Sequence, residues 1–137
     1  MLTGMHVAVI GGDARQLEII KMLIEQDAKI TLIGFEQLDH AFTGTAKEKI
    51  TEADFSDLDA IILPVAGTNN EGQVDTIFSN EKVVLTEELL KQTPEHCTIY
   101  SGISNPYLDK MTAGAKRKLV KLFSRDDVAI YNSIPTV

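Results

Sequence analysis

The feature that most constrains this chain is a nearly continuous apolar run over residues 5–10, which stops at Gly11 and Gly12. Such a run, closed by turn residues, is typical of a β-strand buried on both faces of a parallel sheet. Asp13 then stands where a helix cap belongs, and apolar residues recur behind it at helical spacing. A second apolar run follows at 29–33. The stretch therefore predicts a right-handed β-α-β unit with parallel strands.

Three further apolar runs predict three more strands, over residues 58–63, 97–100 and 128–131. Pro64 ends the first of them, because proline has no N–H to give to a sheet ladder. Between the second and third strands, the only regular element expected is a short edge strand over 48–52.

Two more helices are expected. One is capped by Thr86 and runs through Leu90, and the other is capped by Asn105, has Pro106 in its first turn and extends to Phe123. Basic residues in its last turns would complement the negative end of the helix dipole: Lys116, Arg117, Lys118, Lys121 and Arg125. Strands alternating with helices predict an α/β domain, a doubly wound and mainly parallel five-stranded sheet in a flavodoxin-like or Rossmann-like three-layer sandwich.

Composition narrows the function classes. Thirteen Lys and Arg against twenty Asp and Glu give a net charge of −7, which argues against a broad basic surface for nucleic acid. The single cysteine, Cys97, excludes an internal disulfide and a thiolate zinc cluster. The apolar runs are shorter than a membrane span and the start of the chain lacks a basic signal region, so a cytoplasmic location is expected. Residues 1–137 contain no linker-like segment and are expected to form one domain, whose end just after a predicted strand suggests truncation from a larger protein.

The chemistry is expected at the carboxyl edge of the sheet, where helix N-termini direct their N–H groups into one crevice. Arg15 would bind a carboxylate there through its planar guanidinium, or else be a solvated side chain beside a turn made by Gly12 and a cap made by Asp13. Nucleotide binding by this loop is disfavoured, because it lacks G-x-G-x-x-G and places a carboxylate where a pyrophosphate would lie.

Other loops on the same edge add candidates. The loop after the fourth strand offers hydroxyl groups and a glycine to a small anion, or simply caps the next helix; its candidate residues are Ser101, Gly102, Ser104 and Asn105. Thr68, after the third strand, would add a hydroxyl and an N–H donor. A fourth segment, Asn132-Ser133, belongs to the same edge.

Catalytic sets are scarce. His96 and Cys97 are neighbours, but adjacent strand residues point to opposite faces, which disfavours a nucleophile pair. His40 is a candidate acid or base, or an exposed loop histidine. No metal-ligand, P-loop or G-x-S-x-G motif is present, so metalloprotease, NTPase and hydrolase functions have no support, and no metal site is expected.

Several motifs in combination resemble a known family. They are G-G-D-A-R-Q at 11–16, F-T-G at 42–44, I-L-P at 62–64, S-G-I-S-N at 101–105, A-K-R-K-L-V at 115–120 and Y-N-S-I-P-T at 131–136. With them the whole chain resembles the N-terminal part of one family, that of the dipicolinate synthase A subunit.

The resemblance implies an oxidoreductase of endospore-forming bacteria that makes dipicolinate from a dihydrodipicolinate-type intermediate, with NADP as oxidant. It also implies a partner, the flavoprotein-like B subunit of dipicolinate synthase. It implies the mother-cell cytoplasm as location and a homo-oligomeric assembly. In the family a second half, a Rossmann domain with its own glycine-rich loop, binds NADP. That half is missing here, so this fragment alone is expected to be inactive.

A small dicarboxylate substrate needs cationic and N–H donors without a nucleophile or metal, which favours Gly12, Arg15 and the 101–105 loop. The base is not identified by the sequence; Asp13 and His40 are its candidates. Two alternatives stay open: a standalone flavodoxin-like ligand-binding or regulatory module, and half of a hydroxyacid or alanine dehydrogenase. A receiver domain is excluded, because Pro64-Val65-Ala66 occupies the place of the phosphoacceptor aspartate.

Overall fold

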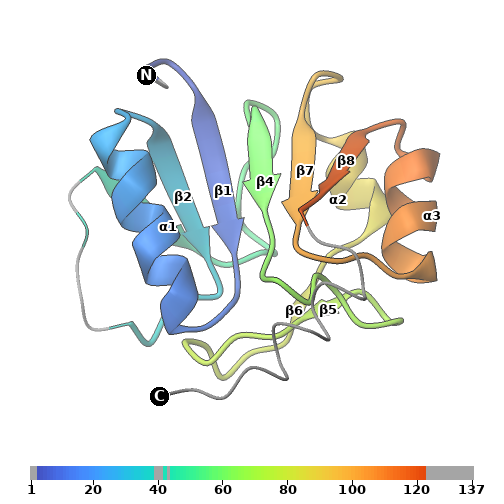
Figure 1. Cartoon of the computed structure of the whole chain (residues 1–137), viewed down its shortest axis with the longest axis horizontal. Coiled ribbons are helices and arrows are strands. Elements are labelled where there is room, and N and C mark those ends of the chain that lie inside the picture. The colour runs from blue at the N-terminus through green and yellow to red at the C-terminus, as the bar shows by residue number, and fades with distance from the viewer. Residues whose placement is uncertain (1–2, 39–41, 43, 123–137) are drawn as a thin grey trace.

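The computed structural model describes residues 3–38, 42 and 44–122. Its main element is a six-stranded sheet in the order β3-β2-β1-β4-β7-β8, and every neighbouring pair in it is parallel (Figure 1). In that order, the strands are Thr45–Glu48, Lys29–Ile33, His6–Ile10, Ala60–Ile62, Thr98–Ser101 and Lys118–Lys121. The chain runs outward from β1 in both directions, which is the plan of a doubly wound sheet. The predicted α/β class is confirmed.

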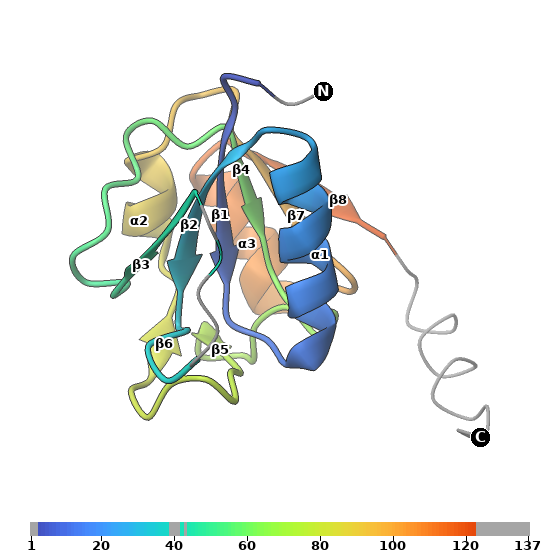
Figure 2. The ribbon, with the colours of Figure 1, turned by 90° about the vertical axis from the view of Figure 1, so that its left-hand side faces the viewer.

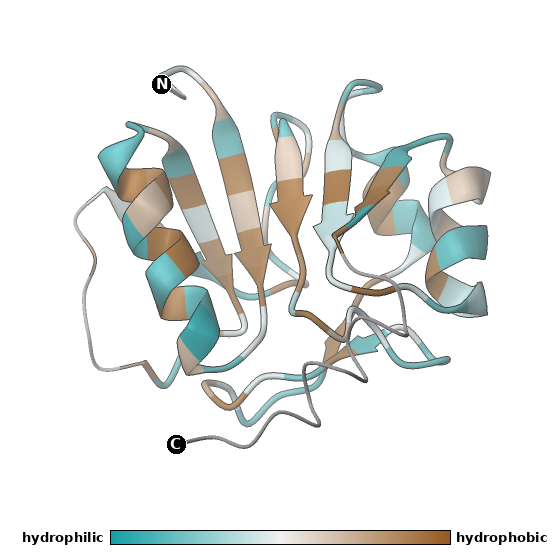
Figure 3. Ribbon diagram, viewed as in Figure 1, coloured by the Kyte–Doolittle hydropathy of each residue, from teal (hydrophilic) through white to brown (hydrophobic). Residues whose placement is uncertain are grey.

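The central strand is β1, and all five of its residues are buried. Val9 pairs with Leu32 of β2 on one side and with Ile62 of β4 on the other. Apolar residues run along these central strands in Figure 3, as the continuous apolar run predicted for a strand covered on both faces.

Helices cover both faces of the sheet. Helix α1 (Ala14–Glu25) lies on one side, and α2 (Glu87–Lys91) lies on the other (Figure 2), as does α3 (Pro106–Gly114). The buried cluster on the α1 side is Val9, Ile20, Ile30, Leu32, Phe35 and Leu38. The larger cluster beneath α2 and α3 includes Ala8, Ile10, Ile61, Leu90, Ile99, Leu108 and Met111. Each fully buried Leu or Ile stabilises the fold by roughly 1.5–3 kcal/mol before entropy is counted.

The predicted helix starts are confirmed. Asp13, Thr86 and Asn105 each accept a hydrogen bond from a backbone N–H in the first turn that follows, at 2.9, 3.2 and 2.8 Å. Pro106 stands at the first position of α3. These short polar side chains satisfy N–H groups that have no partner within the helix, and so fix where each helix begins.

Helix α3 is shorter than predicted. It ends at Gly114 rather than at Phe123, and Lys116 then turns the chain with φ of 58°. Residues 118–121 form β8, in which two exposed lysines flank half-buried Leu119 and Val120. Lysines on an edge strand are a common guard against unwanted pairing. Four of the basic residues assigned to the last helical turns, Lys116, Arg117, Lys118 and Lys121, therefore lie beyond the helix, and Arg125 falls outside the described residues.

Other differences concern the edges of the sheet. The edge strand β3 lies at Thr45–Glu48 and not at 48–52, and an antiparallel hairpin of β5 (Gln73–Val74) and β6 (Val83–Val84) was not predicted at all. Among the described residues the sheet has six strands, with β3 and β8 at its edges, whereas five strands were predicted for the whole chain. The predicted strand at 128–131 and the candidates His40 and Asn132-Ser133 fall outside the described residues. No helix within the described ranges is long and apolar enough to cross a membrane.

Candidate functional site

Three of the predicted loops lie side by side at the carboxyl edge of the sheet. They follow β1, β4 and β7, which are consecutive strands in the sheet order, and this edge is the lower one in Figure 1. Because the strands are parallel, the starts of α1 and α3 meet the same edge, and their N–H groups carry partial positive charge toward it. The edge is therefore the place in this domain with the best geometry for a small anion.

The first loop is closed over by a segment that sequence reasoning left without a role. The N–H of Gly12 donates to the carbonyl of Asp75 at 2.8 Å, and the N–H of Ile77 donates to the carbonyl of Gly12 at 3.1 Å. The hydroxyl of Thr76 also bonds the carbonyl of Gly34, at 2.7 Å. Segment 75–78 thus lies across the ends of β1 and β2. The N–H of Gly12, which was predicted to bind an anion, is therefore already bonded to the carbonyl of Asp75.

Arg15 is held by its neighbour Asp13. The Nη2 of the guanidinium donates to Oδ2 of Asp13 at 2.9 Å, and its Nε reaches both carboxylate oxygens at 3.1 and 3.2 Å. The side-chain bond from Arg15, followed by the backbone bond from the same residue, lowers the pKa of Asp13. Asp13 is therefore a carboxylate stabilised in its charged form and a weak base, which reduces its fitness for proton transfer.

In the loop after β7, most of the predicted site residues hold the loop itself. The hydroxyl of Ser101 donates to the carbonyl of Ile103 at 2.5 Å. A Cβ on Gly102 would lie 2.4 Å from the carbonyl oxygen of Val65, so glycine is what lets this loop approach the one after β4.

The residues that start α3 are engaged in the same way. The hydroxyl of Ser104 donates to Asp109 at 2.7 Å. Asn105 accepts from Leu108 and donates from Nδ2 to the carbonyl of Thr68. These contacts tie the loops after β4 and β7 to the first turn of α3, and they explain the residues without a ligand.

Two polar side chains at the carboxyl edge are not accounted for by such contacts. The hydroxyl of Thr68 and the Nε2 of Gln16 are buried and have no hydrogen-bond partner within the described residues. Sequence reasoning named Thr68 and missed Gln16. A signal was present, because Gln16 precedes Ile20 by four positions and so shares its buried helix face. A polar side chain on a buried helix face needs a hydrogen-bond partner, and this requirement could have drawn attention to Gln16.

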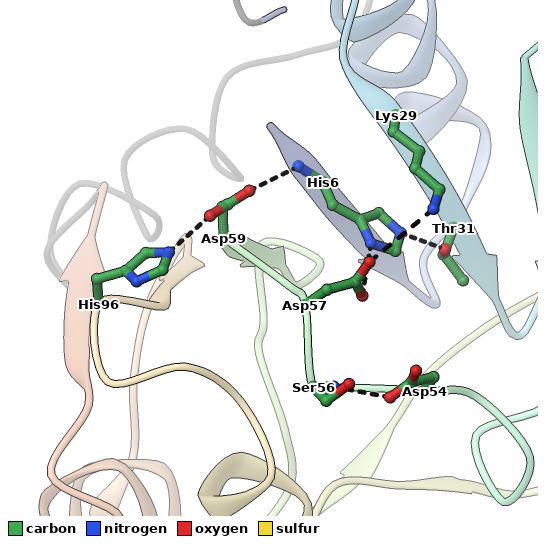
Figure 4. Close-up of polar contacts among 8 residues, drawn as sticks. All are labelled: His6, Lys29, Thr31, Asp54, Ser56, Asp57, Asp59 and His96. Carbon is green, nitrogen blue, oxygen red and sulfur yellow. Dashed lines mark hydrogen bonds and ion pairs between the residues drawn. The ribbon is translucent and has the colours of Figure 1, made fainter. Parts of the chain in front are cut away.

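The opposite, amino edge of the sheet holds a cluster of paired histidines and aspartates (Figure 4). Nδ1 of His6 contacts Oδ1 of Asp57 at 2.9 Å, and Nε2 contacts the hydroxyl of Thr31 at 2.7 Å. Asp59 accepts from the backbone N–H of His6 at 2.8 Å and meets Nε2 of His96 at 2.6 Å. The bond from the His6 backbone, and then that from His96, lower the pKa of Asp59.

These contacts join the amino ends of the central strands, away from the crevice. His96 contacts Asp59, whereas the neighbouring Cys97 is buried in the core, where burial raises the pKa of its thiol. The two side chains are therefore not arranged as a nucleophile and its base. Within residues 3–38, 42 and 44–122, no three His, Cys, Asp or Glu side chains converge in a way that could hold a metal ion.

A comparison of the sequence with known families identifies the family of this chain. Residues 6–123 match the model of the N-terminal domain of the dipicolinate synthase A subunit. The chain belongs to this family. The resemblance inferred from the G-G-D-A-R-Q and S-G-I-S-N motifs is thereby confirmed.

Similar proteins agree with the family match. The dipicolinate synthase A subunit of Bacillus subtilis strain 168 is 65% identical over 137 residues, which are 100% of this chain and 46% of that protein. Crystal structures of the dipicolinate synthase A subunit from Bacillus halodurans and of the dipicolinate synthase A chain from Bacillus subtilis both have a TM-score of 0.88 to this fold, at 61% and 64% identity. Each is matched over 98% of this chain and over 46% and 45% of its own length. The chain thus spans less than half the length of these relatives.

Proposed function

We propose that this chain is the substrate-side domain of an NADP-dependent oxidoreductase that forms dipicolinate from a dihydrodipicolinate-type dicarboxylate. The observation that carries the proposal is the family match over residues 6–123, together with 65% identity to a dipicolinate synthase A subunit over the whole chain. The edge geometry supports it, because two helix N-termini that meet the same edge of the sheet suit a small dianion.

Within the proposal, the domain binds and orients the substrate. The N-terminal turns of α1 and α3 supply partial positive charge to the two carboxylates. Arg15, whose side chain is 57% exposed beside Asp13, lies in the first turn of α1, where a substrate carboxylate competes with Asp13 for the guanidinium. Gly12, Ser101, Gly102 and Asn105 then act by shaping the loops rather than by touching the substrate.

The residues of this domain do not fit the NADP cofactor. The turn at Gly11-Gly12 is occupied by segment 75–78, and Asp13 adds a negative charge at the start of α1, where a Rossmann loop would bind pyrophosphate. We therefore propose that NADP is bound by a second domain in the remainder of a longer protein and that this chain itself carries out no redox step. This chain alone is then inactive.

The same proposal includes the assembly. The matched relatives are designated the A subunit of their enzyme, which suggests that a B subunit is the partner. Location in the cytoplasm of a sporulating mother cell and a homo-oligomeric state follow from the same family reasoning and belong to the proposal.

Calorimetric titration with dipicolinate tests the function. The full-length protein that carries this domain, saturated with NADP, is expected to bind dipicolinate, and with a dihydrodipicolinate-type substrate to produce NADPH absorbance. The 137-residue chain titrated alone shows how much of the site it contains. A full-length protein that binds dipicolinate without any NADP reduction favours the alternative of a ligand-binding module, and absence of both responses contradicts the proposal.

A further inference from the structure

Two buried polar atoms in the described part of the chain lack a hydrogen-bond partner, Nε2 of Gln16 and Oγ1 of Thr68. The residues are only 3% and 5% exposed. A buried polar group without a partner destabilises the folded state, and most buried polar atoms in folded proteins are paired. Two such groups therefore destabilise the ligand-free protein, and no hydrogen bond within the described residues compensates for this.

Both atoms belong to the carboxyl edge. Gln16 is in the first turn of α1 and folds back over the turn at Gly12, where an added Cβ would lie 2.2 Å from its Cγ. Thr68 lies against the start of α3, because its carbonyl accepts from the Nδ2 of the cap residue Asn105. Each unpartnered group therefore accompanies the N-terminal end of a different helix.

The polar groups around them are engaged. Gly12 bonds to Asp75, and Arg15 bonds to Asp13. Ser101 bonds to Ile103. The donors that the sequence motifs suggested are therefore already engaged in the fold. Among the described residues, the atoms left without a partner are the uncharged amide nitrogen of Gln16 and the uncharged hydroxyl of Thr68.

We propose that Gln16 and Thr68 are substrate-contacting residues, one for each end of a small dicarboxylate; this rests on the function proposed above. Gln16 follows β1 and Thr68 follows β4, and these strands are hydrogen-bonded neighbours whose following helices, α1 and α2, cover opposite faces of the sheet. Open α/β sheets bind ligands at such a point, so a small dicarboxylate there can offer one carboxylate to each residue. The carboxamide donates an N–H and the hydroxyl an O–H, and a small outward shift of the covering residues admits the ligand.

Substitution of the two residues distinguishes contact with the substrate from a purely structural role, because stability and binding are expected to change differently. Thr68→Val and Gln16→Met remove the polar atoms at nearly constant shape, so the ligand-free protein is expected to be as stable as the wild type or more stable. The same substitutions are expected to weaken dipicolinate binding about 10-fold or more each, which is the range for one hydrogen bond to a charged carboxylate. The double variant is expected to lose the product of the two factors, because the contacts are at separate ends.

Thr112→Val is the matched control. Its hydroxyl is buried like that of Thr68 but donates to the carbonyl of Leu108 at 2.9 Å. Its removal is expected to lower the melting temperature and to leave dipicolinate affinity unchanged.

The experiment is calorimetric titration of dipicolinate into the full-length protein with NADP, in the wild type and the four variants, with thermal denaturation of each without ligand. Wild-type binding with unchanged affinity in both single variants overturns the inference and leaves the proposed function standing. A loss of melting temperature like that of Thr112→Val also overturns it, because the atoms would then have structural partners. Absence of wild-type binding overturns the proposed function and the inference together.

Discussion

The two edges of the sheet use polar side chains in different ways. At the amino edge, His6, Asp57, Asp59 and His96 are joined to one another or to the backbone by bonds of 2.6–2.9 Å. At the carboxyl edge, the loops bond internally while Gln16 and Thr68 stay without partners among the described residues. In parallel α/β folds the amino edge serves stability and the carboxyl edge serves ligands, and the distribution of satisfied polar groups here follows the same division. Substitutions on either edge test this difference.

The largest effect on stability is expected for Gly102→Ala, at the carboxyl edge. The new methyl group would lie 2.4 Å from the carbonyl oxygen and 2.6 Å from the Cα of Val65, and backbone cannot move aside as a side chain can. We expect a loss of about 3 kcal/mol in the free energy of unfolding, measured by urea denaturation. Gly44→Ala is the control for added bulk, since nothing lies within 4 Å of its Cβ position, although its φ of 83° adds strain of its own. A smaller loss for Gly102→Ala than for Gly44→Ala would mean that the two loops are not in close contact.

A smaller loss is expected for Asp59→Ala at the amino edge. Asp59 accepts from the His6 backbone at 2.8 Å and contacts His96 at 2.6 Å, so its removal unpairs groups on β1 and before β7. Hydrogen bonds to a charged group predict a loss of about 2 kcal/mol in the free energy of unfolding. Asp57→Ala is the comparison variant, and because Asp57 is 55% exposed its loss is expected to stay below about 1 kcal/mol. Equal losses would remove the distinction between a partly buried carboxylate that bonds the backbone of β1 and an exposed surface pair.

The pH dependence of the same variant sharpens the test. The folded state lowers the pKa of Asp59, so its contribution is fully present above the unfolded pKa of about 3.9 and is lost as the pH falls through the folded value. The difference in unfolding free energy between wild type and Asp59→Ala should not narrow from pH 7 to pH 5 and should narrow below about pH 4. A difference that narrows between pH 7 and pH 5 would assign the effect to a group other than Asp59.

The smallest effect is expected for Arg15→Ala, and it concerns binding. From the sequence alone, loss of one charge-assisted contact predicts a decrease in dipicolinate affinity worth roughly 1.5–3 kcal/mol. Because Asp13 already bonds the guanidinium at 2.9 Å, the net loss is expected near the lower end, about 1.5 kcal/mol. Calorimetry on the full-length protein measures it, with Lys21→Ala on the same helix as control. Unchanged affinity would remove Arg15 from the site.

Much of the fold could be predicted because its information is local. The apolar run ending at Gly11, the Asp13 cap and the run at 29–33 gave the first β-α-β unit, with β2 at the predicted bounds. By contrast, the residues at 118–121 fit a helical stripe and an edge strand equally well. Pairing with β7, through Ile99 and Leu119, decided between the two.

For the candidate site, the position of the loops could be predicted from the sequence, but their hydrogen-bond partners could not. Parallel pairing placed Arg15, Thr68 and the 101–105 loop at one edge, as the order of the elements predicted. Which donors are engaged could not be predicted, because the partner of Gly12 is Asp75, far along the chain, and the partner of Asn105 is the carbonyl of Thr68.

The sequence by itself therefore determined the class of fold, the starts of its helices and the edge where a ligand belongs, because apolar period and capping act over a few neighbouring residues. Only the tertiary structure decided which polar groups are satisfied, because hydrogen bonds between distant loops depend on how the strands are ordered. The local pattern places Gln16 on the buried face of α1, but only the hydrogen bonds of the folded protein show that its Nε2 has no partner among the described residues, which makes it a candidate for contact with the substrate.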